Sequence, residues 1–289
     1  MKKIAIVLLG IIVSLISLNY TAKAQSYFSV EVKGKGKPMI LIHGLYCTGE
    51  VWKETVDRYQ KNYQCHIITV AGFGGSSPNL NDHFLESVKD DLITYVKNNK
   101  LKKPVLIGHS MGGFISLWAA ASAPGLFDRV ISVDGVPFMP ALQMAGATAE
   151  SSRPMAENMR KGISNATPEQ TLQNSRSYLP MMMRDKERVE QIAQSAMKCD
   201  VKTQGEVLYE MFTTDLRETV AAIDCPAYIM GAWIGYKDYG TTRESALKGY
   251  QDQVKAIKNC TVEISDTAKH FIFYDEPAWF FSTMDSFLK

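Results

Sequence analysis

The chain has 289 residues, of which 46% are hydrophobic and 21% are charged, so it can bury a large core in one domain with an insertion. Its formal net charge is +2, but three lysines lie in the first 24 residues and the remaining 265 residues carry a net charge of −1. This balance argues against a nucleic-acid partner. The sequence has no internal repeat, heptad run or low-complexity stretch.

Residues 1–24 have the pattern of a secretory signal peptide. Two lysines precede an apolar run from residue 4 to residue 18, and Ala-Lys-Ala at residues 22–24 resembles a cleavage site. The run has about 15 residues, fewer than the roughly 20 that span a bilayer, so we expect cleavage and no stable membrane anchor. No cysteine lies near the site, which argues against a lipoprotein. The mature chain would begin at Gln25, in the periplasm or the medium.

Short apolar runs alternate with helical patterns in the rest of the chain. The expected strands are Phe28 to Val32, Met39 to Ile42, His66 to Val70, Val105 to Ile107, Val130 to Val133, Ala227 to Met230 and Thr261 to Ile264. Residues 84–96 and 111–123 have helical patterns. This alternation predicts an α/β fold, with a mostly parallel sheet covered by helices on both faces.

The alternation stops after Asp134. Residues 138–222 contain no convincing strand, but Thr167 to Gln170 has the pattern of a helix N-terminus with a capping box. We therefore expect a core of residues 25–137 and 223–289, and a helical lid of residues 138–222 over the carboxyl edge of the sheet. Nine of the fourteen methionines fall in this segment, which suggests an apolar lid over a substrate pocket or simply core filling.

Ser110 is the candidate nucleophile. It lies in the segment VLIGHSMGG, where an expected strand leads through Gly-His-Ser-Met-Gly into an expected helix. In this setting the motif forms a strained turn that projects the serine hydroxyl above the sheet. The start of the following helix also directs amide groups toward a developing negative charge.

Four motifs together resemble the α/β-hydrolase superfamily over essentially the whole mature chain. These are PMILIHGLYCTGEVW, VAGFGGSS, VLIGHSMGG and DTAKHFIFYDEPAWF, in the order of the family. The resemblance implies that the amides of Leu45 and Met111 form an oxyanion hole. Of the five histidines, His270 matches the family's order of serine, acid and histidine, and is the expected base; His43 is expected to support the oxyanion loop.

Two carboxylates remain candidates for the acid that orients His270. The family position after the strand of residues 227–230 holds Ile234, and Asp238 is the nearest carboxylate. Residues 241–244 have a capping-box pattern, which would put Asp238 in the loop before the next helix. Some relatives carry the acid one strand earlier, where this chain has Asp134. We favour Asp134, because it follows its strand directly.

These residues predict an exported serine hydrolase with a Ser-His-Asp triad, an acyl-enzyme and a small acyl substrate, needing no metal or organic cofactor. An ester is the expected substrate, while amides, lactones, carbon-carbon bonds beside a carbonyl, and perhydrolysis are alternatives on the same site. A serine nucleophile disfavours dehalogenase and epoxide hydrolase activity. A non-catalytic binding protein is the alternative from another class.

The five cysteines are an odd number for an exported chain, so at least one must be unpaired or paired between chains. They lack the spacing of a zinc site.

Overall fold

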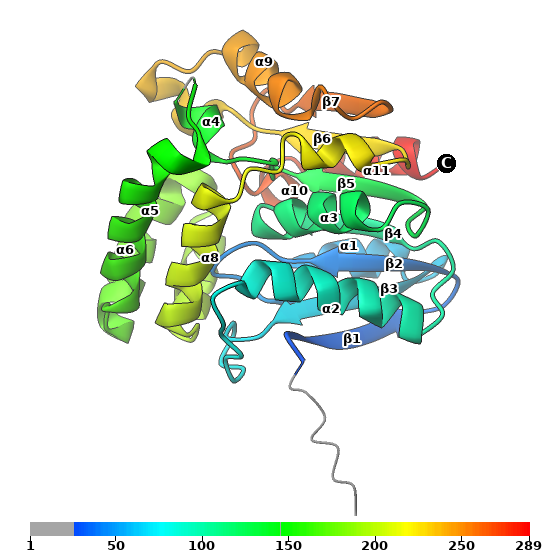
Figure 1. The fold of residues 1–289 in the computed structure, drawn as a ribbon, viewed down its shortest axis with the longest axis horizontal. Coiled ribbons are helices and arrows are strands. Elements are labelled where there is room, and N and C mark those ends of the chain that lie inside the picture. Colours follow the sequence, from blue (N-terminus) through cyan, green and yellow to red (C-terminus); the bar gives the residue numbers. More distant parts are fainter. Residues whose placement is uncertain (1–25, 145) are drawn as a thin grey trace, which may run out of the picture.

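A seven-stranded sheet forms the centre of the computed structural model, which describes residues 26–144 and 146–289 (Figure 1). The strands are β1 (Phe28–Gly34), β2 (Lys37–Ile42), β3 (Tyr63–Val70), β4 (Val105–His109), β5 (Arg129–Val133), β6 (Ala227–Gly231) and β7 (Cys260–Ile264). Their order is β1-β3-β2-β4-β5-β6-β7, with β1 antiparallel and all other neighbours parallel. The predicted fold class and all seven expected strands are confirmed. The predicted signal peptide, residues 1–24, lies outside the described residues.

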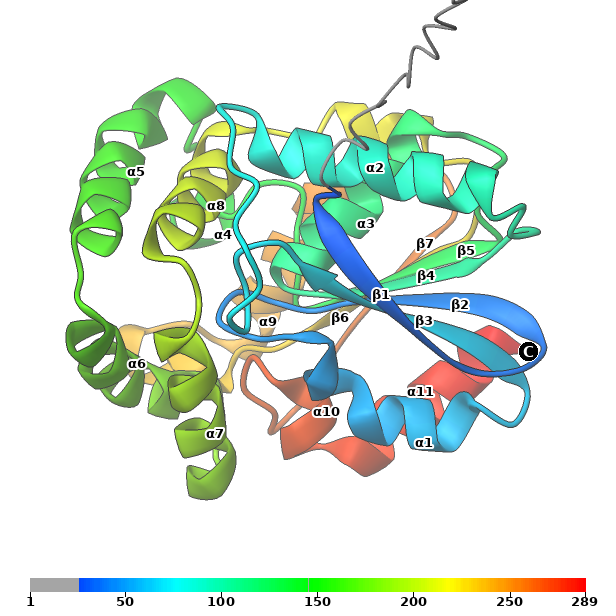
Figure 2. The ribbon, with the colours of Figure 1, turned by 90° about the horizontal axis from the view of Figure 1, so that it is seen from below.

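Helices cover both faces of this sheet (Figure 2). The first face carries α2 (Phe84–Asn98), α3 (Met111–Ser122) and α9 (Arg243–Val254), and the second carries η1 (Gly49–Trp52), α1 (Lys53–Tyr59), α10 (Ile272–Asp275) and α11 (Pro277–Leu288). Every residue of β4 and β6 is buried. The continuous apolar runs at these strands therefore reflect burial on both faces.

The segment between β5 and β6 is helical. It contains α4 (Pro140–Gln143), α5 (Ala149–Ser164), α6 (Pro168–Met182), α7 (Lys186–Met197), α8 (Val201–Thr213) and η2 (Thr219–Ala222). The expected capping box is present at the start of α6, where the Thr167 side chain accepts from the Gln170 amide. Helices α5, α6 and α8 lie together at one end of the sheet (Figure 1). The Asp200 amide, at the start of α8, donates to the Gly72 carbonyl after β3 at 2.7 Å, which joins this segment to the carboxyl edge.

One helix start differs from the prediction. The capping box before α9 uses Thr242 and Ser245, one residue later than expected, because the Thr242 hydroxyl is the one that accepts from the third helical amide. Asp238 lies within the 3-10 helix η3 (Ile234–Tyr239) and not in an irregular loop.

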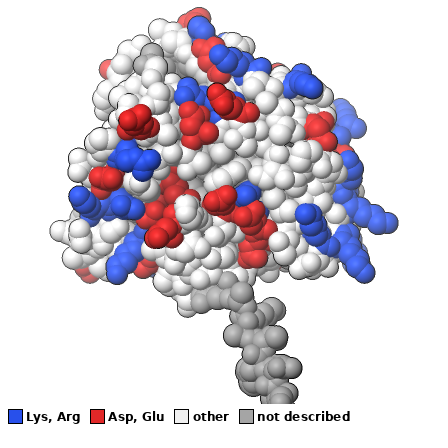
Figure 3. All heavy atoms as spheres, in the orientation of Figure 1, with Lys and Arg blue, Asp and Glu red and all other residues white. Residues whose placement is uncertain are grey.

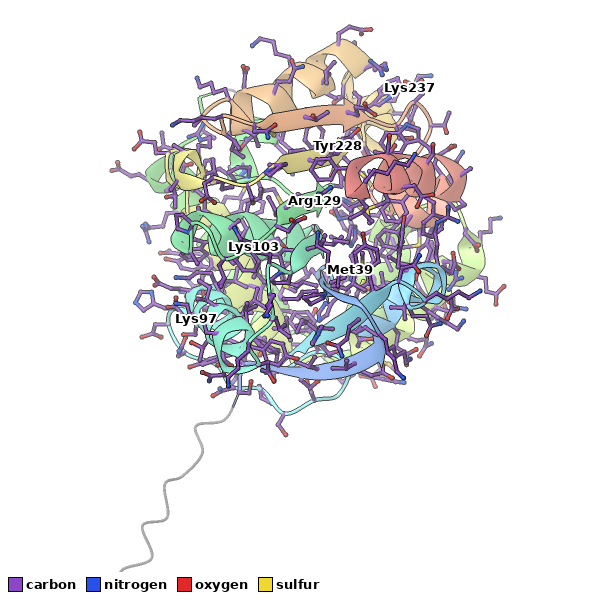
Figure 4. The ribbon with its side chains drawn as sticks, turned by 90° about the vertical axis from the view of Figure 1, so that its right-hand side faces the viewer. Met39, Lys97, Lys103, Arg129, Tyr228 and Lys237 are labelled. Atoms are coloured by element: carbon purple, nitrogen blue, oxygen red, sulfur yellow. The ribbon has the colours of Figure 1, made fainter. Side chains whose placement is uncertain are left out.

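The two ends of the sheet differ in what they carry. Figure 4 looks at the end opposite the helical insertion, where Met39, Arg129 and Tyr228 lie near the starts of their strands. Acidic and basic side chains are both present on the face drawn in Figure 3. Within the described ranges, no helix combines the length and the hydropathy that crossing a membrane requires.

Candidate active site

Ser110 occupies the turn between β4 and α3. Its φ angle is +53°, in the left-handed region that non-glycine residues rarely adopt. The turn is held because the Ser110 amide donates to the Val133 carbonyl at 2.9 Å, and the Ser110 carbonyl accepts from Phe114 at 3.0 Å. The side chain thus lies at the N-terminus of a twelve-residue helix, next to the carboxyl end of β5.

The glycines around Ser110 are required by close packing. A Cβ atom at Gly108 would lie 1.9 Å from the Gly112 carbonyl oxygen, so no larger residue fits where β4 meets α3. A Cβ atom at Gly44 would lie 3.1 Å from the Ser110 Cβ atom, which places the loop after β2 directly against the candidate nucleophile. These contacts explain the glycines of both motifs.

The structure brings His270 and Asp134 together. The His270 Nδ1 atom lies 2.5 Å from Asp134 Oδ2, and the two side chains are 18% and 6% exposed. Since a carboxylate can only accept, the Nδ1–H group donates and the Nε2 lone pair is left free. This is the tautomer that a general base for a serine hydroxyl needs.

The Asp134 carboxylate is fixed by a second pair of donors. Its Oδ1 atom accepts from the Ala232 amide at 3.0 Å and from the Tyr250 hydroxyl. Burial raises the pKa of Tyr250 well above its usual value, and the Asp134 charge adds to this, so the phenol stays protonated and donates. Sequence reasoning missed Tyr250 and Ala232, because no local pattern marks a tyrosine on α9 as a partner of residue 134.

Asp238, the alternative acid, lies elsewhere. It is exposed near the end of η3, and among the described residues the carboxylate hydrogen-bonded to His270 is that of Asp134. The register of the sheet explains why Asp134 lies at the candidate site. Val133 of β5 is paired with His109 of β4, so Asp134 and Ser110, which follow them, meet at the same edge of the sheet.

His43 braces the loop that carries Leu45. Its Nε2 atom accepts from the Val70 amide at 3.0 Å, and Nδ1 therefore donates to the Gly44 carbonyl, 2.7 Å away. Burial lowers the pKa of His43 to about 4, so the ring stays neutral in this arrangement. Neither the Leu45 amide nor the Met111 amide donates a hydrogen bond within the described part of the chain. Both amides therefore have no internal acceptor among the described residues.

His109 packs between the loop after β2 and His270, since a Cβ atom at Gly44 would lie 2.7 Å from His109 Nδ1. Its ring is buried, packs 4.6 Å from the His270 ring between centroids, and its Nε2 atom lies 3.1 Å from the His270 carbonyl oxygen. Burial lowers the pKa of His109 well below its usual value. His109 is thus a neutral packing partner of His270.

The five cysteines are unpaired in the structure. Burial raises the pKa of Cys199 to about 11, which makes it a poor nucleophile at neutral pH. Among the described residues, no three His, Cys, Asp or Glu side chains are grouped as a metal ion would require.

Comparison with known proteins agrees with this architecture. Residues 37–196 match a family model described as the alpha/beta hydrolase fold. A pimeloyl-[acyl-carrier protein] methyl ester esterase of Aliivibrio fischeri is 29% identical over 107 residues, which is 37% of this chain and only 40% of that protein. The (E)-2-((N-methylformamido)methylene)succinate hydrolase of Acinetobacter baylyi is 24% identical, with 89% of this chain and 92% of that protein covered.

A solved structure extends the likeness to the whole fold. The enol-lactonase of Burkholderia xenovorans superposes with a TM-score of 0.72 at 17% identity, covering 90% of this chain and 96% of that one. The family model spans 160 of the 289 residues, more than half of the chain. The chain therefore belongs to the α/β-hydrolase fold family, and the relatives named above include hydrolases and esterases.

Proposed function

We propose that this protein is an exported serine hydrolase that cleaves an ester through Ser110, His270 and Asp134. The observation that carries the proposal is the hydrogen bond of 2.5 Å between His270 and Asp134, at the sheet edge where Ser110 follows β4. An acyl-transfer site needs a nucleophile, a general base and donors for the oxyanion. We assign these roles to Ser110 in its strained turn, to His270 with its unprotonated Nε2 atom, and to the amides of Leu45 and Met111.

In the proposed reaction, the Ser110 oxygen attacks the substrate carbonyl carbon while His270 Nε2 takes the hydroxyl proton. The carbonyl oxygen becomes negative and accepts from the amides of Leu45 and Met111. The tetrahedral intermediate collapses, and the proton passes from His270 to the departing alkoxide. Water then attacks the acyl-enzyme by the same route, which releases the acid and restores Ser110.

The activities of the relatives support a carbonyl substrate, because one is a methyl ester esterase and another an enol-lactonase. We propose an ester as the substrate, with residues 138–222 acting as a lid at the carboxyl edge. The helices of this segment support the lid role because α8 is joined to the loop after β3.

Two assays test this function. Mature protein is incubated with a fluorophosphonate probe and mapped by mass spectrometry, with Ser110→Ala as the control. We expect labelling at Ser110 and hydrolysis of p-nitrophenyl acetate, both absent in the variant. Rates with panels of amides and lactones, and the rate of acyl transfer to hydrogen peroxide, rank the alternative activities. Labelling without turnover of any of these substrates would support a binding protein with a reactive serine instead.

Export is a separate part of the proposal. It is supported by the charged, apolar and small-residue pattern of residues 1–24. Expression of the full chain in a bacterium, followed by fractionation and intact-mass measurement, should give an exported chain that begins at Gln25. A chain that keeps residue 1 and stays in the cytoplasm would contradict it.

A further inference from the structure

The end of α6 is hydrogen-bonded to the loop that carries His270. The Phe271 amide, directly after His270, donates to the Met182 carbonyl at 3.1 Å. On the other side of His270, the Lys269 side chain donates to the Pro180 carbonyl of α6. Helix α10, which begins two residues after His270, lies next to this part of the helical insertion (Figure 2). Both chain neighbours of the candidate base are therefore bonded to the insertion.

Asp275 lies at the centre of this junction. Its Oδ1 atom accepts from the Arg184 amide, in the turn between α6 and α7, at 2.9 Å. Its Oδ2 atom accepts from the Lys269 amide, directly before His270, at 2.9 Å. The Asp275 side chain is only 1% exposed. A carboxylate buried this deeply needs hydrogen-bond donors, and here each of its two oxygens holds a different segment of the chain.

Apolar packing supports the same junction. Met182 and Met183, at the end of α6, are 4% and 1% exposed. They belong to the same buried apolar cluster as Phe271 and Phe273. These two methionines therefore fill the core beside the His270 loop, which is one of the two roles expected for the methionines of the insertion.

The Arg184 side chain adds contacts that are more exposed. Its guanidinium group donates to the Asp275 carbonyl at 2.6 Å and to Glu276 Oε1 at 3.1 Å, but the side chain is 45% exposed. Ion pairs with this exposure contribute little to stability. The buried Asp275 carboxylate and the backbone amides therefore hold the junction.

We infer that Asp275 is a positioning residue for His270, and that the insertion and the His270 loop move as one unit. The inference rests on the proposed ester hydrolysis, in which His270 is the base. Displacement of the turn between α6 and α7 would remove the acceptors of Lys269 and Phe271 and shift the histidine between them. His270 must stay within hydrogen-bond reach of Ser110, and a misplacement of about 1 Å can lower a rate on the order of a hundredfold.

Replacing Asp275 by asparagine tests the role of the carboxylate. Asparagine has the same shape but one acceptor oxygen, so its NH₂ group must face the amide of either Arg184 or Lys269. We expect kcat for p-nitrophenyl acetate to fall roughly ten- to a hundredfold, with KM within about threefold of wild type. Asp275→Glu keeps both acceptor oxygens in a larger side chain and should retain more activity than Asp275→Asn. A role in packing alone would reverse this order, since asparagine is isosteric with aspartate.

Two control variants separate the buried carboxylate from surface charge. Arg184→Ala keeps the backbone amide and removes only the exposed ion pairs. Asp57→Asn removes an aspartate of α1 whose side chain is 53% exposed. Both should keep kcat within about threefold of wild type.

The proton between His270 and Asp134 reports the position of the histidine independently of turnover. In a hydrogen bond of 2.5 Å this proton is strongly deshielded and resonates far downfield in the proton NMR spectrum. We expect the signal in wild type, and a broadened or shifted signal in Asp275→Asn. An unchanged signal and a wild-type kcat in a folded Asp275→Asn variant would overturn the inference. If wild type hydrolyses no ester, the proposed function fails, and the NMR signal alone then decides whether Asp275 positions His270.

Hydrogen exchange of the wild-type protein tests the shared motion without any variant. The Arg184 and Phe271 amides both donate across the junction, so one opening should expose both. Their protection factors should agree within about threefold. An Arg184 amide with protection more than about tenfold lower than that of Phe271 would show that the turn opens without the His270 loop, and would overturn the inference.

Discussion

Replacing Asp134 by asparagine tests the assignment of the acid most directly. In the native protein the Ala232 amide and the Tyr250 hydroxyl both donate to Asp134 Oδ1. An asparagine at this position must therefore keep its oxygen toward those two donors. Its NH₂ group then faces the His270 Nδ1 atom, which the native Oδ2 atom meets at 2.5 Å.

This reversal forces His270 into the wrong tautomer. With a donor facing it, Nδ1 becomes the acceptor and the ring proton moves to Nε2, where it blocks uptake of the Ser110 proton. In the serine-protease triad, the equivalent change lowers kcat about 10⁴-fold. We expect a loss on the order of 10⁴ in kcat, close to 5.5 kcal/mol of transition-state stabilisation.

The assay is kcat and KM for p-nitrophenyl acetate at pH 7.5, with circular dichroism as the check on folding. Asp238→Asn is the matched control, because Asp238 is an exposed aspartate on η3, and it should keep activity within about twofold of wild type. A folded Asp134→Asn variant that retains more than a tenth of the wild-type kcat, or a large loss in the Asp238 variant, would refute the reasoning.

Three further predictions concern Tyr250, Cys199 and Glu210; Glu210 is a buried residue of α8 whose carboxylate accepts from the Phe84 and Leu85 amides at the start of α2. Tyr250→Phe should move the acidic limb of the pH profile of kcat/KM to higher pH by roughly 0.5 to 1 unit, because the Asp134 carboxylate loses one hydrogen-bond donor of about 1 kcal/mol. An unchanged pH profile together with lower thermal stability would mean that Tyr250 has a purely structural role. Burial raises the pKa of Glu210 from 4.5 to about 7, so between these pH values the folded state binds a proton that the unfolded chain does not. The free energy of unfolding should therefore rise by up to roughly 3 kcal/mol as pH falls from 7 to 4.5. Urea melts at pH 5 and 7.5 should show this rise in wild type and not in Glu210→Gln. The Cys199 thiol, with its pKa raised by burial to about 11, should resist iodoacetamide at pH 7.5 until the protein is unfolded, and rapid native alkylation at this site would contradict its burial.

The amino-acid sequence by itself determined the strands, the helical insertion and the position of Ser110. Each of these depends on signals within a few neighbouring residues: apolar runs, a capping box, and two glycines around a serine between a strand and a helix. Short-range sterics fix such features, as the 1.9 Å approach at Gly108 illustrates. Local patterns therefore suffice to predict them.

Only the tertiary structure decided which carboxylate lies beside His270 and what holds it there. Asp134 is 136 residues from His270 and 116 residues from Tyr250 along the chain. Their meeting depends on β5 and β6 being neighbours in the sheet and on α9 packing behind them. Contacts of this range arise from the packing of whole elements, which no local pattern encodes.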